Sequence, residues 1–155
     1  MHLRVLAVGN RMPSWVQQGI LDYQKRFPRE WGFQWVELPL GMRTKSGNPA
    51  KAIESESKAM LAAIQEREYV IALDINGKSW STASLSQKMQ QWQTQGLNVC
   101  LLIGGPDGLS TRCLQRANLC WSLSALTLPH PVVRVVLSEQ LYRSWTILNH
   151  HPYHR

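Results

Sequence analysis

Residues 99–108 read Val-Cys-Leu-Leu-Ile-Gly-Gly-Pro-Asp-Gly, an apolar run that changes abruptly into a glycine turn. Short apolar runs bounded by turn residues are typical of strands buried in a parallel sheet. Because glycine has no Cβ, such a turn leaves backbone N–H and C=O groups open to a ligand. Taken alone, a Gly-Pro turn is an ordinary connection. It lacks the GxGxxG pattern and the Lys and Ser/Thr of phosphate-binding loops, which argues against a dinucleotide or a triphosphate.

A second segment, residues 121–131, reads Trp-Ser-Leu-Ser-Ala-Leu-Thr-Leu-Pro-His-Pro. An uncharged, apolar loop of this kind normally lines a pocket or an interface, because loops otherwise face water. Its small and apolar side chains suit a flat aromatic ring such as adenine, and the prolines would hold its shape. We expect the two segments to lie side by side and to form one ligand pocket.

The rest of the chain alternates strand and helix patterns. Strands are expected at residues 2–8, 33–38, 69–74, 98–103 and 119–124, and helices from 13 to 27, 49 to 67, 85 to 95, 111 to 118 and 131 to 148. Residues 75–78 are expected to form a turn and residues 40–48 a loop. This order predicts a single α/β domain over residues 1–155, with a mainly parallel sheet and helices on both faces.

Composition narrows the class of protein. With 155 residues, 44% hydrophobic and 17% charged, the chain is expected to be globular. We find no apolar run long enough for a membrane span and no signal-peptide pattern. Cys100, Cys113 and Cys120 form no CxxC motif, which favours a reducing cytoplasm and buried thiols. Four of the five histidines lie at or beyond residue 130, but no Cys or acid clusters with them, so we expect no metal.

The net charge of +7 is unevenly distributed. Residues 1–50 hold seven Lys/Arg and three Asp/Glu, and residues 109–155 hold five and one. If the two ends meet, they form a positive face suited to RNA phosphates, although a basic chain also simply gains solubility. Loop 40–48 carries Arg43 and Lys45, and it is either a mobile phosphate-contacting loop or a solvated connection.

The C-terminal region offers two further features. Its helix has an apolar stripe wider than one core face needs, which indicates a second buried surface, that of a two-fold partner. The stripe comprises Val133, Val136, Leu137, Leu141, Trp145 and Leu148. The tail after residue 148 is either disordered or functional, since Tyr153, His154 and Arg155 can stack, transfer protons and pair with phosphate.

These segments together resemble a known family. Residues 101–110, Leu-Leu-Ile-Gly-Gly-Pro-Asp-Gly-Leu-Ser, are similar to the glycine loop of the SPOUT methyltransferases. Residues 123–130, the helix with Arg134 and the Glu-Gln-Leu-Tyr-Arg run at 139–143, and the His-Pro-Tyr-His-Arg ending are more specific. They resemble the small bacterial members that methylate N3 of a pseudouridine in 23S ribosomal RNA. The resemblance spans the chain from Val8 to Arg155, with Asp107 where Glu is expected.

The resemblance implies a trefoil knot built from residues 101–130 that holds S-adenosylmethionine. It implies cofactor contacts from Leu73, Gly104, Leu123, Ser124, Ala125, Leu126, Thr127 and Leu128. It also implies a homodimer with a composite active site, acting on pseudouridine 1915 in the assembled ribosome.

Methyl transfer to an imide nitrogen requires positioning and the loss of a proton. A nearby cation favours the anion, a role that suits Arg143, and His130 or His154 would accept the proton. Tyr153 would stack on or hydrogen-bond the base, and Arg155, Arg43 and Lys45 would contact RNA. Two other hypotheses remain open: an RNA- or ribosome-binding module that uses the pocket for a regulatory nucleotide without catalysis, and a catalytically silent structural dimer.

Overall fold

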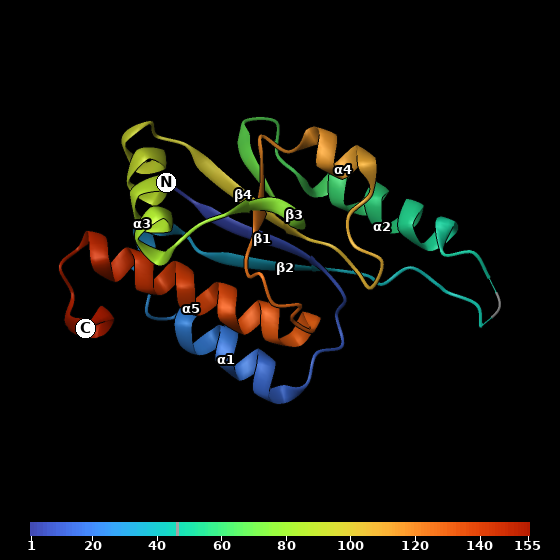
Figure 1. Ribbon diagram of the computed structural model, residues 1–155, viewed down its shortest axis with the longest axis horizontal. Coiled ribbons are helices and arrows are strands. Elements are labelled where there is room, and N and C mark those ends of the chain that lie inside the picture. Colours follow the sequence, from blue (N-terminus) through green and yellow to red (C-terminus); the bar gives the residue numbers. More distant parts are fainter. Residues whose placement is uncertain (46) are drawn as a thin grey trace.

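A five-stranded sheet, in which every paired strand is parallel, runs through the middle of the molecule (Figure 1). The computed structural model describes residues 1–45 and 47–155, so Ser46 in the predicted loop 40–48 lies outside the described residues. The strand order is β2-β1-β4-β3-β5. The strands are β1 (Leu3–Val8), β2 (Gln34–Leu38), β3 (Glu68–Ser79), β4 (Asn98–Ile103) and β5 (Leu119–Ser122).

Helices cover both faces of the sheet, as predicted for an α/β fold (Figure 1). One face packs against α1 (Ser14–Gln24), α3 (Thr82–Thr94) and α5 (His130–Leu148), and its core includes Met89, Leu101 and Leu141. The other face packs against α2 (Ala50–Ala63) and α4 (Thr111–Arg116), with Met60 and Cys100 in its core. Two short 3-10 helices, η1 (Arg29–Trp31) and η2 (Pro152–His154), complete the chain. Burial of alternate residues of each strand in opposite cores is what fixes this layering.

Local sequence explains where several helices begin and end. The hydroxyls of Ser81 and Ser110 accept hydrogen bonds from the backbone N–H of Ser84 and Cys113 at the first turns of α3 and α4. α3 ends before Gly96, whose φ of +66° is the left-handed conformation that suits glycine after a helix. Two other predicted ends were too late, because α1 ends at Gln24 rather than near residue 27 and α2 ends at Ala63 rather than near residue 67.

The predicted turn at residues 75–78 is wrong, because these residues belong to β3. The pairing of β3 with β5 shifts register: Trp121 pairs with Leu73 and again with Lys78. The residues between them form a bulge, in which Ile75 is 81% exposed. A Cβ on Gly77 would lie 2.6 Å from the backbone nitrogen of Trp121, so only glycine allows this close approach of the two strands.

The cysteines are free, and their burial matches the expectation for two of the three. Cys100 and Cys113 are buried and Cys120 is half-buried. Burial raises the pKa of the Cys100 thiol to about 12, so this thiol stays protonated near neutral pH. Among the residues that the structure describes, no helix is both long and apolar enough to cross a bilayer.

Candidate active site

A cavity of about 680 Å³ opens where the glycine loop, the loop after β5 and the bulge of β3 meet. Seven of the eight predicted cofactor contacts line it: Leu73, Gly104, Leu123, Ser124, Leu126, Thr127 and Leu128. Ala125 is exposed and absent from the lining that the described residues form. Several lining residues were not predicted from the sequence as cofactor contacts, among them Asp74, Ile75, Asn76 and Asp107. The expectation that the two loops form one pocket is therefore confirmed.

The glycine loop is a tight, closed turn. The N–H of Gly108 donates to the carbonyl of Gly105 at 2.9 Å, and Gly108 has a φ of +78°. A Cβ on Gly104 would lie 2.5 Å from the carbonyl carbon of Gly108, so a side chain at residue 104 would force the turn open. Backbone groups rather than side chains consequently form much of this wall of the cavity.

The opposite wall is the loop after β5, which internal hydrogen bonds shape. The hydroxyl of Ser122 donates to the carbonyl of Ser124 at 3.2 Å, and the hydroxyl of Ser124 accepts from the N–H of Leu126 at 2.9 Å. The Leu126 side chain is 74% exposed at the rim. An exposed leucine at the edge of a cavity provides apolar surface for a ligand or a partner chain to cover.

His130 lines this cavity and is neutral at physiological pH. Burial is the main reason why the pKa of His130 falls from 6.5 to about 4, and the neighbouring Arg134 cation lowers it further. The Gly104 backbone opposes this shift. The Nε atom of Arg134 donates to Nε2 of His130 at 2.8 Å. Since a guanidinium only donates, Nε2 carries the lone pair and the ring proton is on Nδ1. Nε2 of His130 is thus already engaged within the chain.

Arg134 itself is fully buried, although the sequence analysis named it only as part of a motif. Its guanidinium pairs with Glu37 at 2.7 Å and donates to the carbonyls of Val8 and Gly9 at 3.3 and 2.6 Å. These contacts tie α5 to the carboxyl ends of β1 and β2. A buried arginine whose donors are satisfied in this way fixes the position of the helix end that carries His130.

The other predicted catalytic residues form a separate polar cluster near the C-terminus. One carboxylate oxygen of Glu139 accepts from Nε of Arg143 at 2.7 Å and from the Tyr153 hydroxyl at 3.1 Å. The Arg143 guanidinium lies 5.0 Å from the Tyr153 ring centre, and this ring packs edge-on against Tyr142. Burial is the main cause that raises the pKa of Tyr153, so its hydroxyl remains a donor at neutral pH. The tail is therefore ordered on α5, and the alternative of a disordered tail is wrong.

A single chain does not bring all the predicted catalytic residues together. Thirteen residues of α5 separate His130 from Arg143, which corresponds to about 20 Å at a rise of about 1.5 Å per residue. His154 belongs to the tail cluster, and its Nδ1 is buried without a hydrogen-bond partner in the described part of the chain. The site thus consists of a cavity at one end of α5 and a polar cluster at the other.

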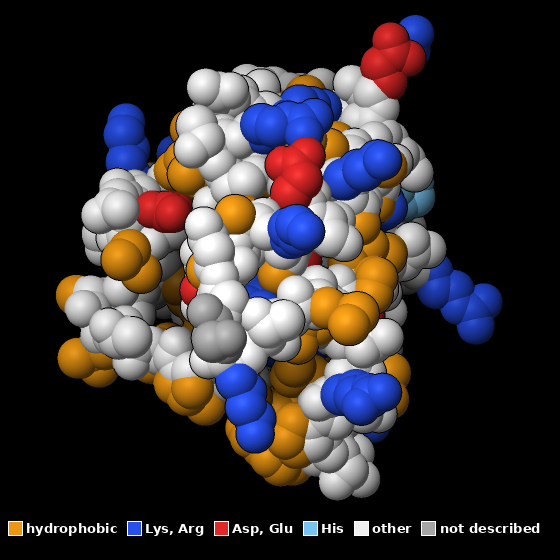
Figure 2. All heavy atoms as spheres, turned by 90° about the vertical axis from the view of Figure 1, so that its right-hand side faces the viewer, with side chains coloured by type: hydrophobic (Ala, Val, Ile, Leu, Met, Phe, Trp, Pro, Cys, Tyr) orange, Lys and Arg blue, Asp and Glu red, His pale blue; other side chains and the backbone are white. Residues whose placement is uncertain are grey.

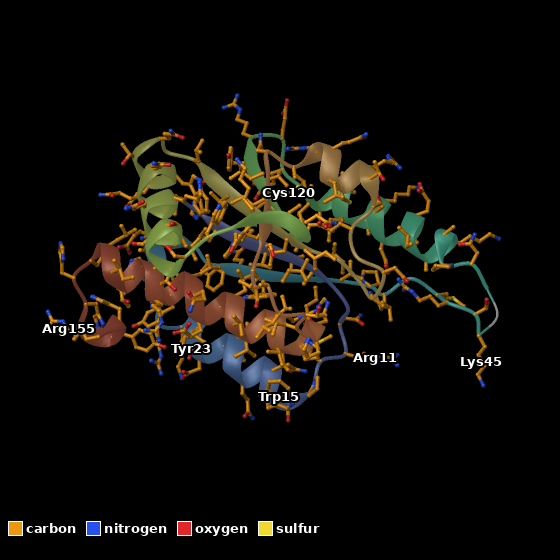
Figure 3. All side chains as sticks on the ribbon, in the orientation of Figure 1. Arg11, Trp15, Tyr23, Lys45, Cys120 and Arg155 are labelled. Atoms are coloured by element: carbon orange, nitrogen blue, oxygen red, sulfur yellow. The ribbon has the colours of Figure 1, made fainter. Side chains whose placement is uncertain are left out.

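The predicted RNA-binding residues are also dispersed. α1 packs on α5, so the two basic ends of the chain do meet, but Arg155 and Lys45 lie at opposite ends of the longest axis (Figure 3). Lysine and arginine side chains are spread over the face at the Lys45 end, around a few acidic ones (Figure 2). Arg43 is committed to ion pairs with Glu56 and Asp107, at 2.8 and 2.9 Å. Of the three, Lys45 and Arg155 are the exposed ones.

The cavity fits the cofactor that the family resemblance implies. Its volume lies within the usual range for small-ligand sites, and leucines and backbone groups form most of its lining. Asp74 lines it beside this apolar surface and suits a ligand that carries positive charge, whereas the charge of Asp107 is already paired with Arg43. The described residues contain no group of three or more His, Cys, Asp or Glu that could hold a metal ion.

Comparisons with known proteins show the family of the chain and agree with its fold. Residues 1–154 match the family described as predicted SPOUT methyltransferases, and the chain belongs to that family. Proteins named ribosomal RNA large subunit methyltransferase H are similar over their full length: the one from Saccharophagus degradans is 58% identical and the one from Marinomonas sp. 52%, each over 100% of both chains. A probable methylase family protein from Haemophilus influenzae shares the fold, with a TM-score of 0.58 and 12% identity over 96% of this chain and 67% of its own.

Proposed function

We propose that this protein transfers a methyl group from S-adenosylmethionine to N3 of a pseudouridine in large-subunit ribosomal RNA. The observation that carries the proposal is the cavity between the glycine loop and residues 122–130, in a chain 58% identical to a protein named ribosomal RNA large subunit methyltransferase H. The finer elements of the proposal are pseudouridine 1915 of 23S RNA as the target, the assembled ribosome as the substrate, the cytoplasm as the location and a trefoil knot over residues 101–130.

S-adenosylmethionine supplies an electrophilic methyl group when bound. The loop after β5 would hold the adenine ring between leucine side chains such as Leu123 and Leu128, and backbone groups of Gly104 would fix its orientation. Such positioning supplies most of the rate in an in-line transfer, because the acceptor and the methyl carbon must be held close and aligned. The chain's contribution at this end is therefore shape rather than acid–base chemistry.

The acid–base chemistry would belong to the tail cluster. Arg143 provides the cation that favours the N3 anion of the base, held in place by Glu139. Tyr153 remains protonated and would stack on or donate to the base. His154 is the better candidate for the proton acceptor, because Nε2 of His130 already accepts a hydrogen bond from Arg134. Arg155 and Lys45 would contact RNA phosphates.

Cavity and tail cluster would complete one another across a two-fold homodimer. In each chain they lie at opposite ends of α5, so a single copy does not place the tail next to the methyl group. A two-fold axis across α5 turns the second helix around and brings one tail toward the other cavity. The α5 face that is left half-exposed is available for this contact and carries Arg143.

Nucleoside mass spectrometry of ribosomal RNA tests the proposal directly. A strain that lacks this protein should lose N3-methylpseudouridine from its large-subunit RNA, and the wild-type gene should restore it. Calorimetry should show binding of S-adenosylmethionine to the purified protein. A strain with unchanged nucleosides would overturn the enzymatic proposal. If the protein then also binds a regulatory nucleotide in place of S-adenosylmethionine, it acts as a binding module.

A further inference from the structure

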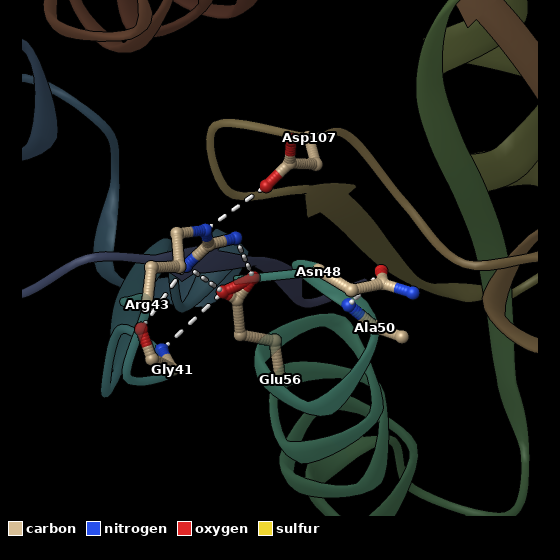
Figure 4. A network of polar contacts seen from close by, with 6 residues as sticks. All are labelled: Gly41, Arg43, Asn48, Ala50, Glu56 and Asp107. Carbon is tan, nitrogen blue, oxygen red and sulfur yellow. Dashed lines mark hydrogen bonds and ion pairs between the residues drawn. The ribbon is translucent and has the colours of Figure 1, made fainter. Parts of the chain in front are cut away.

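Arg43 was expected to contact RNA, but its side chain is bound within the chain on three sides (Figure 4). Two of its nitrogens donate to the Glu56 carboxylate at 3.1 and 2.8 Å. Its Nε donates to Asp107 at 2.9 Å, and another bond reaches the Gly41 carbonyl at 3.1 Å. The guanidinium thus joins three parts of the molecule: its own loop, helix α2 and the glycine loop that lines the cavity.

Glu56 is the buried centre of this network. Its residue is 5% exposed, on the face of α2 that packs toward the sheet. Besides Arg43, the carboxylate accepts from the Gly41 N–H at 3.3 Å. A Cβ on Gly105 would lie 2.7 and 3.0 Å from the two carboxylate oxygens, so Glu56 is packed directly against the back of the glycine loop. Gly105 therefore lacks a side chain in order to fit Glu56, not only to admit a ligand.

We infer that Arg43 and Glu56 are positioning residues of the cofactor cavity: they hold the glycine loop of residues 104–108 in its binding conformation. The inference rests on the proposed function, because it takes the cavity as the cofactor site. α2 also contacts the chain just after this loop, since the hydroxyl of Ser57 lies 2.7 Å from that of Ser110, the N-cap of α4.

The electrostatics of the network explain why both residues are needed. A carboxylate as buried as that of Glu56 is costly unless a cation and further donors satisfy it. Arg43 meets this need with two hydrogen bonds and uses its remaining Nε to reach Asp107 on the loop that lines the cavity. Without Arg43, Glu56 would keep only the Gly41 N–H among its described partners. The carboxylate would then move toward water, and the glycine loop would lose its packing contact with Glu56 at Gly105.

A matched pair of variants separates positioning from RNA contact. Arg43→Gln removes a basic residue that is paired, and Lys45→Gln removes an exposed one two residues away in the same loop. Calorimetry with S-adenosylmethionine and S-adenosylhomocysteine gives cofactor affinity, and steady-state kinetics on ribosomes give separate KM values for cofactor and ribosome. We expect Arg43→Gln to weaken cofactor binding about tenfold or more and to raise KM for the cofactor alike, because the loop loses its alignment.

Lys45→Gln should leave the cofactor affinity and its KM within about twofold of wild type, since Lys45 lies outside the network. Arg43→Lys should rescue only part of the loss, because an ammonium cannot bridge two carboxylates as a guanidinium fork does. A double-mutant cycle with Asp107→Asn should show coupling in cofactor affinity between residues 43 and 107. Thermal melting checks that each variant is folded at the assay temperature.

The outcomes are distinguishable from a failure of the proposed function. If wild-type protein binds neither S-adenosylmethionine nor S-adenosylhomocysteine, the proposed function is wrong. If wild type binds both and Arg43→Gln binds them equally well but raises KM for the ribosome, Arg43 contacts RNA and the positioning role is refuted. If Arg43→Gln and Glu56→Gln both lower cofactor affinity while KM for the ribosome stays unchanged, the positioning role is supported.

Discussion

Buried polar side chains, rather than the apolar core, set the local geometry at both ends of the cavity. Glu56 lies behind the glycine loop and Arg134 lies behind His130. Each is fixed by partners from segments far away in the sequence, such as Glu37 for Arg134. Because charged groups are rarely buried without satisfied partners, such residues mark places where the position of the backbone matters to the protein.

The pKa of His130 gives the first prediction. Folding lowers it from 6.5 to about 4, so the unfolded chain takes up a proton that the native chain does not bind between these pH values. Stability from this group is fully present above about pH 6.5 and is lost progressively as the pH falls toward 4. We expect His130→Gln, which keeps an acceptor for Arg134, to show a shallower loss of unfolding free energy between pH 6.5 and 4.5. Urea denaturation at several pH values measures this.

Identical curves for wild type and His130→Gln would mean that His130 titrates normally in the folded protein. The hydrogen bond that Nε2 of His130 accepts from Arg134 would then not persist in solution.

The predicted site residues lie together in the structure where they are continuous in sequence. Seven of the eight predicted cofactor contacts line the cavity, because six of the eight follow one another in a single uncharged loop. The Arg43–Glu56–Asp107 network was not predicted, since its carboxylates lie 13 and 64 residues from the arginine. A charged residue in a glycine-containing loop has the same sequence appearance whether it faces RNA or a buried carboxylate.

At the level of elements, the bulge in β3 depends on one glycine. Gly77→Ala would place a Cβ 2.6 Å from the backbone of Trp121, so β3 and β5 must move apart. We expect a loss of about 1–3 kcal/mol of stability and weaker cofactor binding, because Asp74 and Asn76 in the bulge line the cavity. Gly96→Ala is the matched control: it strains a left-handed residue after α3, away from the cavity. It should lower stability without changing cofactor affinity, and equal affinities for both variants would contradict the role of the bulge.

The C-terminal 3-10 helix η2 gives a second prediction at the level of elements, in which cofactor affinity is kept and methyl transfer is lost. Deleting residues 151–155 removes the Tyr153 ring from Tyr142 and its hydroxyl from Glu139. We expect a loss of about 1–3 kcal/mol and a decrease in Tm of about 2–10 °C. Cofactor affinity should remain, because the cavity residues are elsewhere, while methyl transfer to ribosomes should fall at least about a hundredfold. Full-rate transfer by the truncated protein would exclude the tail from the active site.

Strands and helices were predictable from sequence to different degrees. β4 and β2 were located to within a residue, and for β4 the reason is a continuous apolar run that leaves little choice of ends. β3 was predicted too short, because Asn76-Gly77 reads as a hairpin turn when no partner strand is considered. Only the close pass of β5 over Gly77 explains why the strand continues, and that contact joins segments more than forty residues apart.

At the scale of the whole molecule, the dimer contact was expected on the apolar stripe of α5, but part of that stripe is buried within the chain. Leu141 and Leu137, part of the predicted stripe, are fully buried within the chain and belong to its core. The half-exposed face lies on the other side of the helix, at helical spacing. Val136 is the one residue that this face shares with the predicted stripe, and the whole face comprises Val132, Val136, Glu139, Gln140, Arg143 and Ile147.

We expect this face to be the two-fold seam, so Val136→Arg should convert a dimer at micromolar concentration into a monomer by sedimentation. Cofactor affinity should change little, since one chain forms the cavity, but transfer to ribosomes should be lost. Gln93→Arg, on the exposed side of α3, is the control and should stay dimeric. A wild-type protein that sediments as a monomer would refute the composite site.

The separation of cavity and tail along α5 has a genetic consequence. In the proposed dimer, a subunit with Gly104→Ala lacks a working cavity but offers an intact tail, and a subunit without residues 151–155 offers the reverse. Each homodimer is inactive, yet a mixed dimer contains one site with both parts intact and one with neither. Two silent alleles expressed in the same cell should therefore complement each other and restore methylated ribosomes, whereas either allele expressed twice should not.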